Sequence, residues 1–210
     1  MTSTKINKKQ LEIFLERVPP HPNPNYELEQ YLTPSNLAST LLWTAYLRGD
    51  IKKNKLVADL GCGTGRLCAG ASILGAYCLC IEIDDNSIYV AKEFFRENML
   101  DFEPIIADVA HLKLSRKIDT VIQNPPFGVV NKGADILFLK KALEIGKVVY
   151  TIHKSNPKSS QIIRKIAETE NYTVEVITSR YDLKPYYPWH KERSHKFSVD
   201  LYLLKENLTG

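Results

Sequence analysis

Four residues, Asn124 to Phe127, read Asn-Pro-Pro-Phe and follow the strand-forming run at 118–123. Neither Pro125 nor Pro126 can donate a backbone hydrogen bond, and the residue before a proline is pushed toward an extended conformation. We therefore expect a stiff segment at a strand tip, with an amide at one end and a ring at the other. Two fixed acceptors beside a flat ring would bind a planar group that donates hydrogen bonds.

A second group of residues reads DLGCGTGRL, at 59–67, and places Asp59 before Gly61, Gly63 and Gly65. Glycines at this spacing let the backbone turn tightly and approach a ligand closely. Taken alone, the pattern is equally typical of an ordinary turn between a strand and a helix. Its interpretation therefore depends on the neighbouring strand tips.

Acidic residues follow at the next two strand tips. Glu82 ends a strand about twenty positions after Gly61, a spacing at which a carboxylate accepts hydrogen bonds from ribose hydroxyls. Asp108 ends the third strand, where an acceptor for a nucleobase could lie. A glycine-rich tip followed by two acidic tips predicts a cofactor that contains a nucleoside.

Strands and helices alternate along the chain, which places these tips at one edge of a sheet. We predict strands over 56–60, 77–84, 103–108, 118–123, 147–153, 172–182 and 197–205, and helices over 4–18, 35–48, 87–98, 134–146 and 159–171, with another after Gly65. The fold class is α/β, a Rossmann-like sheet of seven strands, mostly parallel, with an antiparallel C-terminal edge. An N-terminal helix and Pro-rich arm over 1–34 precede a main domain over 35–210.

The composition is that of an ordinary globular protein, with 210 residues, 44% hydrophobic, and a formal charge of +4. No apolar run reaches membrane-spanning length and no signal peptide is recognisable, so we expect a cytoplasmic protein without membrane contact. The four cysteines, Cys62, Cys68, Cys78 and Cys80, lack a C-x-x-C pair. We expect them to be reduced and buried, and we predict no metal site.

The glycine loop together with Asn-Pro-Pro-Phe resembles the class I S-adenosylmethionine-dependent methyltransferases that act on planar amino groups. The chemistry accounts for these residues, because the lone pair of an exocyclic amine is delocalised into its ring. Acceptors on both N–H groups favour a pyramidal, nucleophilic nitrogen. The Asn124 side-chain oxygen and the Pro125 carbonyl are the two candidates, Pro126 stiffens the backbone, and Phe127 would stack on the base.

Further motifs resemble the methyltransferase-like protein 5 family, which has archaeal and eukaryotic members and methylates adenine N6 in small-subunit ribosomal RNA. LEQYLTP (28–34), IADV (106–109), NPPFG with KGAD (132–135), HKS (153–155) and SVDLYLL (198–204) occur in that order. The resemblance implies S-adenosylmethionine as cofactor, with a small zinc-binding activator protein as a partner by analogy with the eukaryotic members. It assigns cofactor contacts to Gln30, Tyr31, Thr33, Asp59, Gly61, Gly63, Thr64, Gly65, Arg66, Glu82, Asp108, Val109 and Asn124.

A basic, aromatic segment at 180–196 joins the last two predicted strands. Rings that stack on unpaired bases beside cations that meet phosphates suit RNA, although a solvated hairpin would also read this way. We assign substrate contacts to Lys132, His153, Lys154, Tyr187, Trp189, His190 and Lys191.

Several other functions remain open at this point. Guanine N2 in ribosomal RNA, adenine in DNA and a protein glutamine amide are also planar amines, which Asn-Pro-Pro-Phe does not distinguish. An enzyme acting on DNA usually carries a separate target-recognition domain, and a glutamine methyltransferase would not need the basic segment. A non-catalytic factor for ribosomal RNA assembly is the alternative from outside the enzymes.

Overall fold

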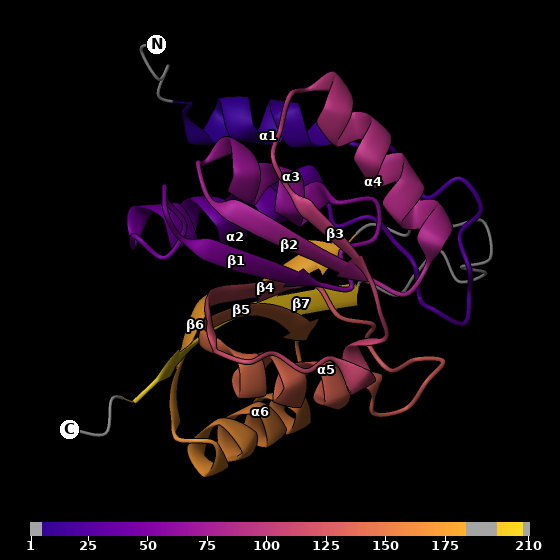
Figure 1. Ribbon diagram of the computed structural model, residues 1–210. Coiled ribbons are helices and arrows are strands. Elements are labelled where there is room, and N and C mark those ends of the chain that lie inside the picture. Colours follow the sequence, from indigo (N-terminus) through magenta and orange to yellow (C-terminus); the bar gives the residue numbers. More distant parts are fainter. Residues whose placement is uncertain (1–5, 184–196, 208–210) are drawn as a thin grey trace.

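The structure, a computed structural model, describes residues 6–183 and 197–207, which form a sheet between two layers of helices (Figure 1). In these residues seven strands pair in the order β3-β2-β1-β4-β5-β7-β6. Strands β1 to β5 are parallel, and β7 is antiparallel to both β5 and β6, which confirms the predicted fold class. The strands are β1 Leu56–Leu60, β2 Tyr77–Glu82, β3 Glu103–Ile106, β4 Ile118–Gln123, β5 Gly146–Lys154, β6 Tyr172–Leu183 and β7 Phe197–Glu206.

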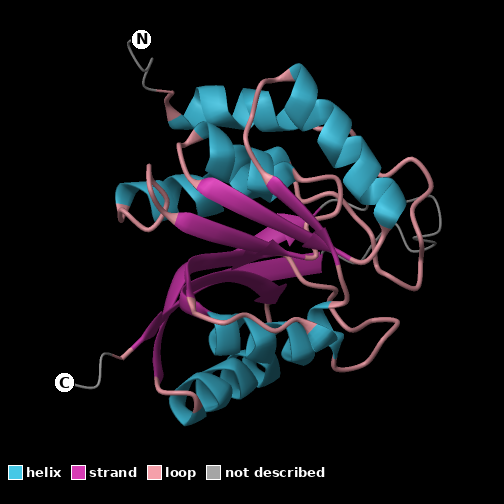
Figure 2. Ribbon diagram, in the orientation of Figure 1, coloured by secondary structure: helices cyan, strands magenta, loops and turns pink. Residues whose placement is uncertain are grey.

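The helices divide between the two faces of the sheet, as Figure 2 shows. One face carries α1 Lys8–Glu16, α2 Ser35–Leu47, α3 Arg66–Ile73 and α4 Asp85–Glu97, and the other carries α5 Ala134–Ile145 and α6 Pro157–Thr169, with the short 3-10 helix η1 Val109–His111 beside α5. Each face has its own apolar core. Leu41 and Phe95 belong to the first core, and Leu139 and Ile163 to the second.

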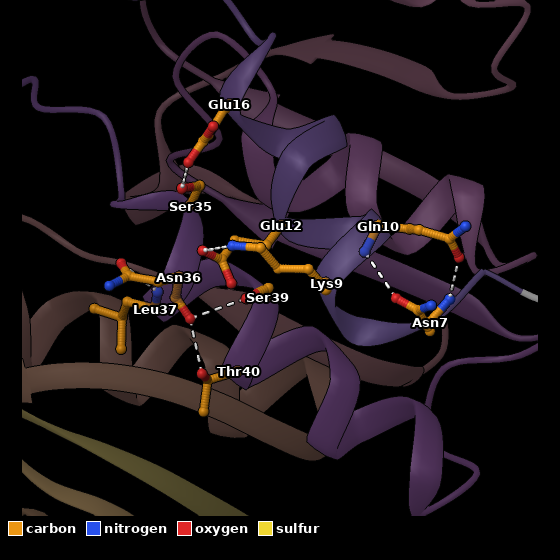
Figure 3. A network of polar contacts seen from close by, with 10 residues as sticks. All are labelled: Asn7, Lys9, Gln10, Glu12, Glu16, Ser35, Asn36, Leu37, Ser39 and Thr40. Carbon is orange, nitrogen blue, oxygen red and sulfur yellow. Dashed lines mark hydrogen bonds and ion pairs between the residues drawn. The ribbon is translucent and has the colours of Figure 1, made fainter.

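Helix α1 begins later than its apolar spacing indicates. Asn7 caps it, because its side chain accepts a hydrogen bond from the Gln10 amide while the Gln10 side chain accepts one from the Asn7 amide, both at 2.9 Å (Figure 3). Such a capping box fixes the start of a helix. At its other end, the Ser35 hydroxyl donates to Glu16 at 3.2 Å, which ties α1 to the start of α2.

The N-terminal helix is packed on α2 and α3. Leu11 and Leu15 of α1 are fully buried in the same core as Leu41 of α2. The division at residue 34 stays a prediction. Within the described ranges, no helix combines the length and the apolar character that crossing a membrane requires.

The cysteine prediction is partly wrong. Cys68 of α3 and Cys80 of β2 form a disulfide, with their Cα atoms 6.2 Å apart. Cys62 and Cys78 are free and buried as expected. The pairing is a consequence of packing α3 on β2, a contact that the spacing of cysteines along the chain does not reveal.

The strand order reverses between β1 and β4, because the chain moves from β1 toward β3 and then returns to the other side of β1. In open α/β sheets, ligands bind outside the carboxyl ends of the strands at such a reversal. Gly61 follows β1 and Asn124 follows β4, so the fold brings both sequence motifs to this crevice.

Candidate active site

The glycine loop after β1 has the left-handed backbone that its composition predicts. Gly61 and Gly63 have φ of 67° and 56°. A Cβ added at Gly63 would lie 2.9 Å from Nε2 of His21, and one at Gly61 would lie 2.9 Å from the Phe138 ring. These positions therefore require glycine for conformation and for space.

Glu82 at the tip of β2 organises this loop. Its carboxylate accepts hydrogen bonds from the amides of Gly63 at 2.8 Å, Ile83 at 2.9 Å and Asp84 at 3.1 Å. Burial raises the pKa of Glu82, and the three amides oppose that shift. A carboxylate offers about four acceptor positions, so Glu82 keeps capacity for a hydroxyl donor.

Asp59 is almost completely buried at the end of β1, with 1% of its surface exposed. Its Oδ2 accepts the Cys68 amide at 3.0 Å, whereas its Oδ1 is buried without a hydrogen-bond partner. Burial raises the pKa of this carboxyl to about 8. A cationic group beside this acid would favour its charged form.

Residues 19–33, here called the strap, cross the crevice and join its two halves. Gln30 donates to Asp84, the cap of α4, at 2.8 Å, and His21 contacts the Ser87 hydroxyl at 2.8 Å. Burial lowers the pKa of His21, although Asp84 opposes the shift. The strap is thereby attached to the half of the crevice formed by β2 and α4.

Thr64 and Arg66 hold the beginning and the end of the strap. The Thr64 hydroxyl donates to the Pro19 carbonyl at 2.6 Å. The Arg66 guanidinium donates to the carbonyls of Thr33 at 2.7 Å and Val18 at 3.2 Å. The resemblance assigned both residues to the cofactor, and that assignment stays a prediction. In the structure, the Thr64 hydroxyl and these guanidinium donors bond to the backbone of the strap and of Val18 beside it.

The Asn-Pro-Pro-Phe segment lies on the other side of the strap. The Asn124 amide nitrogen donates to the Thr33 hydroxyl at 3.0 Å, and its Oδ1 is buried without a partner. The Tyr31 hydroxyl donates to the Pro125 carbonyl at 3.2 Å, and the Tyr31 ring stacks on Phe127 with centroids 5.1 Å apart. Thr33 therefore orients the amide so that its oxygen is left as an acceptor.

Glu29 is the contact that the sequence did not reveal. Its carboxylate accepts the amides of Phe127 and Val130, both at 2.8 Å, and its own φ is 49°, which is uncommon for a non-glycine residue. Nearby, Asn131 donates to the Glu27 carbonyl at 2.7 Å. Glu29 lies within the quoted LEQYLTP motif, so the signal was present although no role had been assigned.

These elements enclose a cavity of ≈ 310 Å³, in the range of small-molecule sites. Its lining contains most of the predicted cofactor residues and Pro126, and also His21, Ile83, Leu137 and Phe138, which the sequence did not indicate. Thr64, Gly65, Pro125 and Phe127 lie outside the lining. The predicted residues in it are Gln30, Tyr31, Thr33, Asp59, Gly61, Gly63, Arg66, Glu82, Asp108, Val109 and Asn124.

None of the predicted substrate residues in the described part of the chain lines this cavity. Lys132 is exposed and Lys154 is partly exposed, and their contact with a substrate stays a prediction. His153 is 1% exposed, shares a hydrogen bond of 2.9 Å with Thr151, and has its pKa lowered to about 4 by burial. Its predicted contact with substrate is therefore corrected to a role inside the sheet. Tyr187, Trp189, His190 and Lys191 lie outside the described residues.

The chain is similar to known methyltransferases in sequence and in structure. Residues 36–177 match the family described as Methyltransferase small domain. The chain is 38% identical over 203 residues to the rRNA N(6)-adenosine-methyltransferase METTL5 of Danio rerio, covering 91% of this chain and 95% of that one. A crystal structure of a Pyrococcus horikoshii protein, described there as a proposed RNA methyltransferase, matches with a TM-score of 0.86. The two sequences are 38% identical, and the match covers 99% of this chain and 100% of that one.

A more distant structure shares the fold. It is the Thermus thermophilus 16S rRNA N2 G1207 methyltransferase RsmC in complex with AdoMet and guanosine, with a TM-score of 0.63 and 19% identity. The match covers 84% of this chain and 44% of that one. The residues of the cavity suit a cationic cofactor that contains a nucleoside. Oδ1 of Asp59 is a buried acceptor without a partner, and Glu82 keeps capacity to accept a hydrogen bond from a hydroxyl.

Proposed function

The chain belongs to the METTL5 family of rRNA N(6)-adenosine-methyltransferases, and on that premise we propose how its residues methylate N6 of adenine in RNA. The observation that carries the mechanism is the Asn124 amide. Its nitrogen is fixed by Thr33, so its buried, unpartnered oxygen is presented as an acceptor. The Pro125 carbonyl follows directly in a backbone stiffened by two prolines.

S-adenosylmethionine is the cofactor, and it supplies an electrophilic methyl group. Asp59 would accept a hydrogen bond from the cofactor's ammonium group through its free Oδ1. Glu82 would accept one from a ribose hydroxyl, and Asp108 and Val109 would frame the adenine. The strap closes this part of the cavity, because Gln30 bonds to Asp84 beside Glu82.

The chain's own residues prepare the target amine. The Asn124 oxygen and the Pro125 carbonyl each accept one N6 hydrogen, which draws the lone pair out of conjugation with the ring. Phe127 stacks on the base and fixes the direction of attack. The nitrogen forms a bond to the methyl carbon as the bond from that carbon to sulfur breaks, and the methylated amine then loses one proton to solvent. This preorganisation supplies the catalysis without a strong base.

The RNA substrate is ribosomal, and we propose the small-subunit RNA in particular. Lys132 precedes α5 and Lys154 ends β5, and both would meet phosphates near the target loop. The target adenine must be unpaired or flipped out to reach Asn124. The basic segment at 180–196 would add further contacts.

We also propose that a small zinc-binding activator protein docks on this chain. The support is the edge position of β3 in the described sheet, with Ile106 57% exposed on that strand. A free strand edge with apolar side chains pairs readily with another chain.

Nucleoside mass spectrometry tests the proposed function. The protein is incubated with S-adenosylmethionine and small-subunit ribosomal RNA from a strain that lacks it, and the digested RNA is examined for methylated bases. The expected product is N6-methyladenosine, and RNA from the parent strain, already modified, is the matched control. N2-methylguanosine would overturn the choice of base, and no product after adding back a co-purified partner would overturn RNA methylation.

A further inference from the structure

Tyr31 makes two contacts with the target loop. Its ring stacks on Phe127 with centroids 5.1 Å apart and an angle of 21° between the planes. Its hydroxyl donates a hydrogen bond to the Pro125 carbonyl at 3.2 Å. Both partners belong to the set that would hold the target base, so any role of Tyr31 in base binding rests on the proposed function.

These contacts have the same chemistry as those expected of adenine. A flat ring lies on Phe127, and a polar hydrogen at the edge of that ring points to the Pro125 carbonyl. Adenine would place its own ring on Phe127 and one of its N6 hydrogens on the same oxygen. We propose that Tyr31 holds the place of the target base and must leave Phe127 before adenine can bind.

The strap is built so that Tyr31 can move without unfolding its surroundings. Gln30, Leu32 and Thr33 are buried, at 8%, 8% and 6% exposure, whereas Tyr31 is partly exposed. Gln30 is held by Asp84, and the Thr33 carbonyl is held by Arg66. The backbone is thus fixed on both sides of Tyr31, so the exchange would need only a rotation of this side chain and no movement of the strap.

The exchange explains how the target loop keeps its shape without RNA. Phe127 is 9% exposed, although a ring that receives a base would otherwise face solvent. Tyr31 covers it and occupies an acceptor that would otherwise bind water. A base that makes both contacts can replace Tyr31, whereas a group that makes only one of them competes poorly. Tyr31 is therefore a specificity-determining residue for a planar amine.

The Tyr31→Phe variant separates this role from a simple structural one. It removes the hydroxyl that occupies the Pro125 carbonyl but keeps a ring for packing. The test measures the affinity of the full chain, with S-adenosylhomocysteine present, for an RNA fragment that contains the unmethylated target adenine and for the same fragment abasic at that position. The dissociation constant of the abasic fragment divided by that of the adenine fragment reports the contribution of the base alone, because the phosphate contacts are the same in both.

We expect this ratio to be about fivefold larger in Tyr31→Phe than in the natural protein, because one ordinary hydrogen bond no longer competes with the base. Tyr26→Phe, in the same strap and with Tyr26 58% exposed, is the matched control and should leave the ratio unchanged. An equal or smaller ratio in Tyr31→Phe would overturn the proposal, because Tyr31 would then assist the base. If the natural protein does not methylate adenine in RNA, the proposed function fails instead.

Discussion

Replacing Glu29 with Gln removes the negative charge that holds the target loop to the strap. The Glu29 carboxylate accepts the amides of Phe127 and Val130, each at 2.8 Å. A glutamine oxygen can accept only from the side on which it lies, and its NH2 group would face the other amide. In the variant, one backbone amide therefore donates to a neutral oxygen instead of a carboxylate. The other backbone amide faces the glutamine NH2 group and has no acceptor.

The size of the effect follows from these two bonds. A hydrogen bond to a charged group contributes about 1.5–3 kcal/mol, and an amide left without an acceptor costs about 1–3 kcal/mol. The same substitution also affects the target loop when it is detached from the strap, so part of this cost cancels. We expect the loop conformation that holds the base to be destabilised by about 2 kcal/mol. That corresponds to a decrease in kcat/KM for methyl transfer to RNA of roughly 30-fold.

Initial rates of methyl transfer, measured with cofactor affinity by calorimetry, test this reasoning. The rate should fall more than the affinity for S-adenosylhomocysteine, because the Glu29 carboxylate bonds to two amides of the target loop. Glu27→Gln is the control, because the Glu27 side chain is exposed two residues earlier. A Glu29→Gln rate within twofold of that control would refute the positioning role.

Two further predictions concern the cofactor side and the core. Burial raises the pKa of Asp59 to about 8, so below that pH the carboxyl is mostly protonated while the cofactor's ammonium requires the charged form. The affinity for S-adenosylhomocysteine, measured by calorimetry, should rise by up to about tenfold per pH unit from pH 6 to 8 and then level off, and Asp59→Asn should remove the slope. For the disulfide, alkylation of denatured, unreduced protein should modify only Cys62 and Cys78. Replacing Cys68 with Ala should lower the free energy of unfolding by about 3 kcal/mol, because the disulfide closes a short loop; four reactive thiols would contradict the pairing.

The strands of the sheet could be predicted from the sequence because the signals that mark them are local. Short apolar runs between turn residues mark the parallel strands, and alternating apolar residues mark β6 and β7. The glycine and proline residues at 61–65 and 125–126 mark where β1 and β4 end. The right-handed crossover rule then places these tips together. The boundaries shifted by a few residues where a local hydrogen bond decides them, as at Asn7, whose capping box starts α1 after the first lysine of the predicted helix.

The missed features all depend on contacts between distant parts of the chain. Glu29 meets Val130 across about a hundred residues, and Cys68 meets Cys80 only because α3 packs on β2. The resemblance assigned Thr64 and Arg66 to the cofactor, and it gave no sign that their side chains also bond to the strap. No periodicity in one sequence reports such pairings, since the strap is an irregular segment.

The central claim is that the Asn124 oxygen activates the target amine, and single-turnover methylation by Asn124→Ala tests it most directly. Removing one preorganised hydrogen-bonding group from an active site costs about 10² to 10³ in rate. We predict a decrease of at least about 100-fold, with cofactor affinity within about threefold of the natural protein. Asn98→Ala, which removes a side-chain hydrogen bond of 2.7 Å to Phe94 at the far end of α4, controls for local folding losses and should keep nearly full activity. If Asn124→Ala methylates RNA as fast as Asn98→Ala, the claim is contradicted.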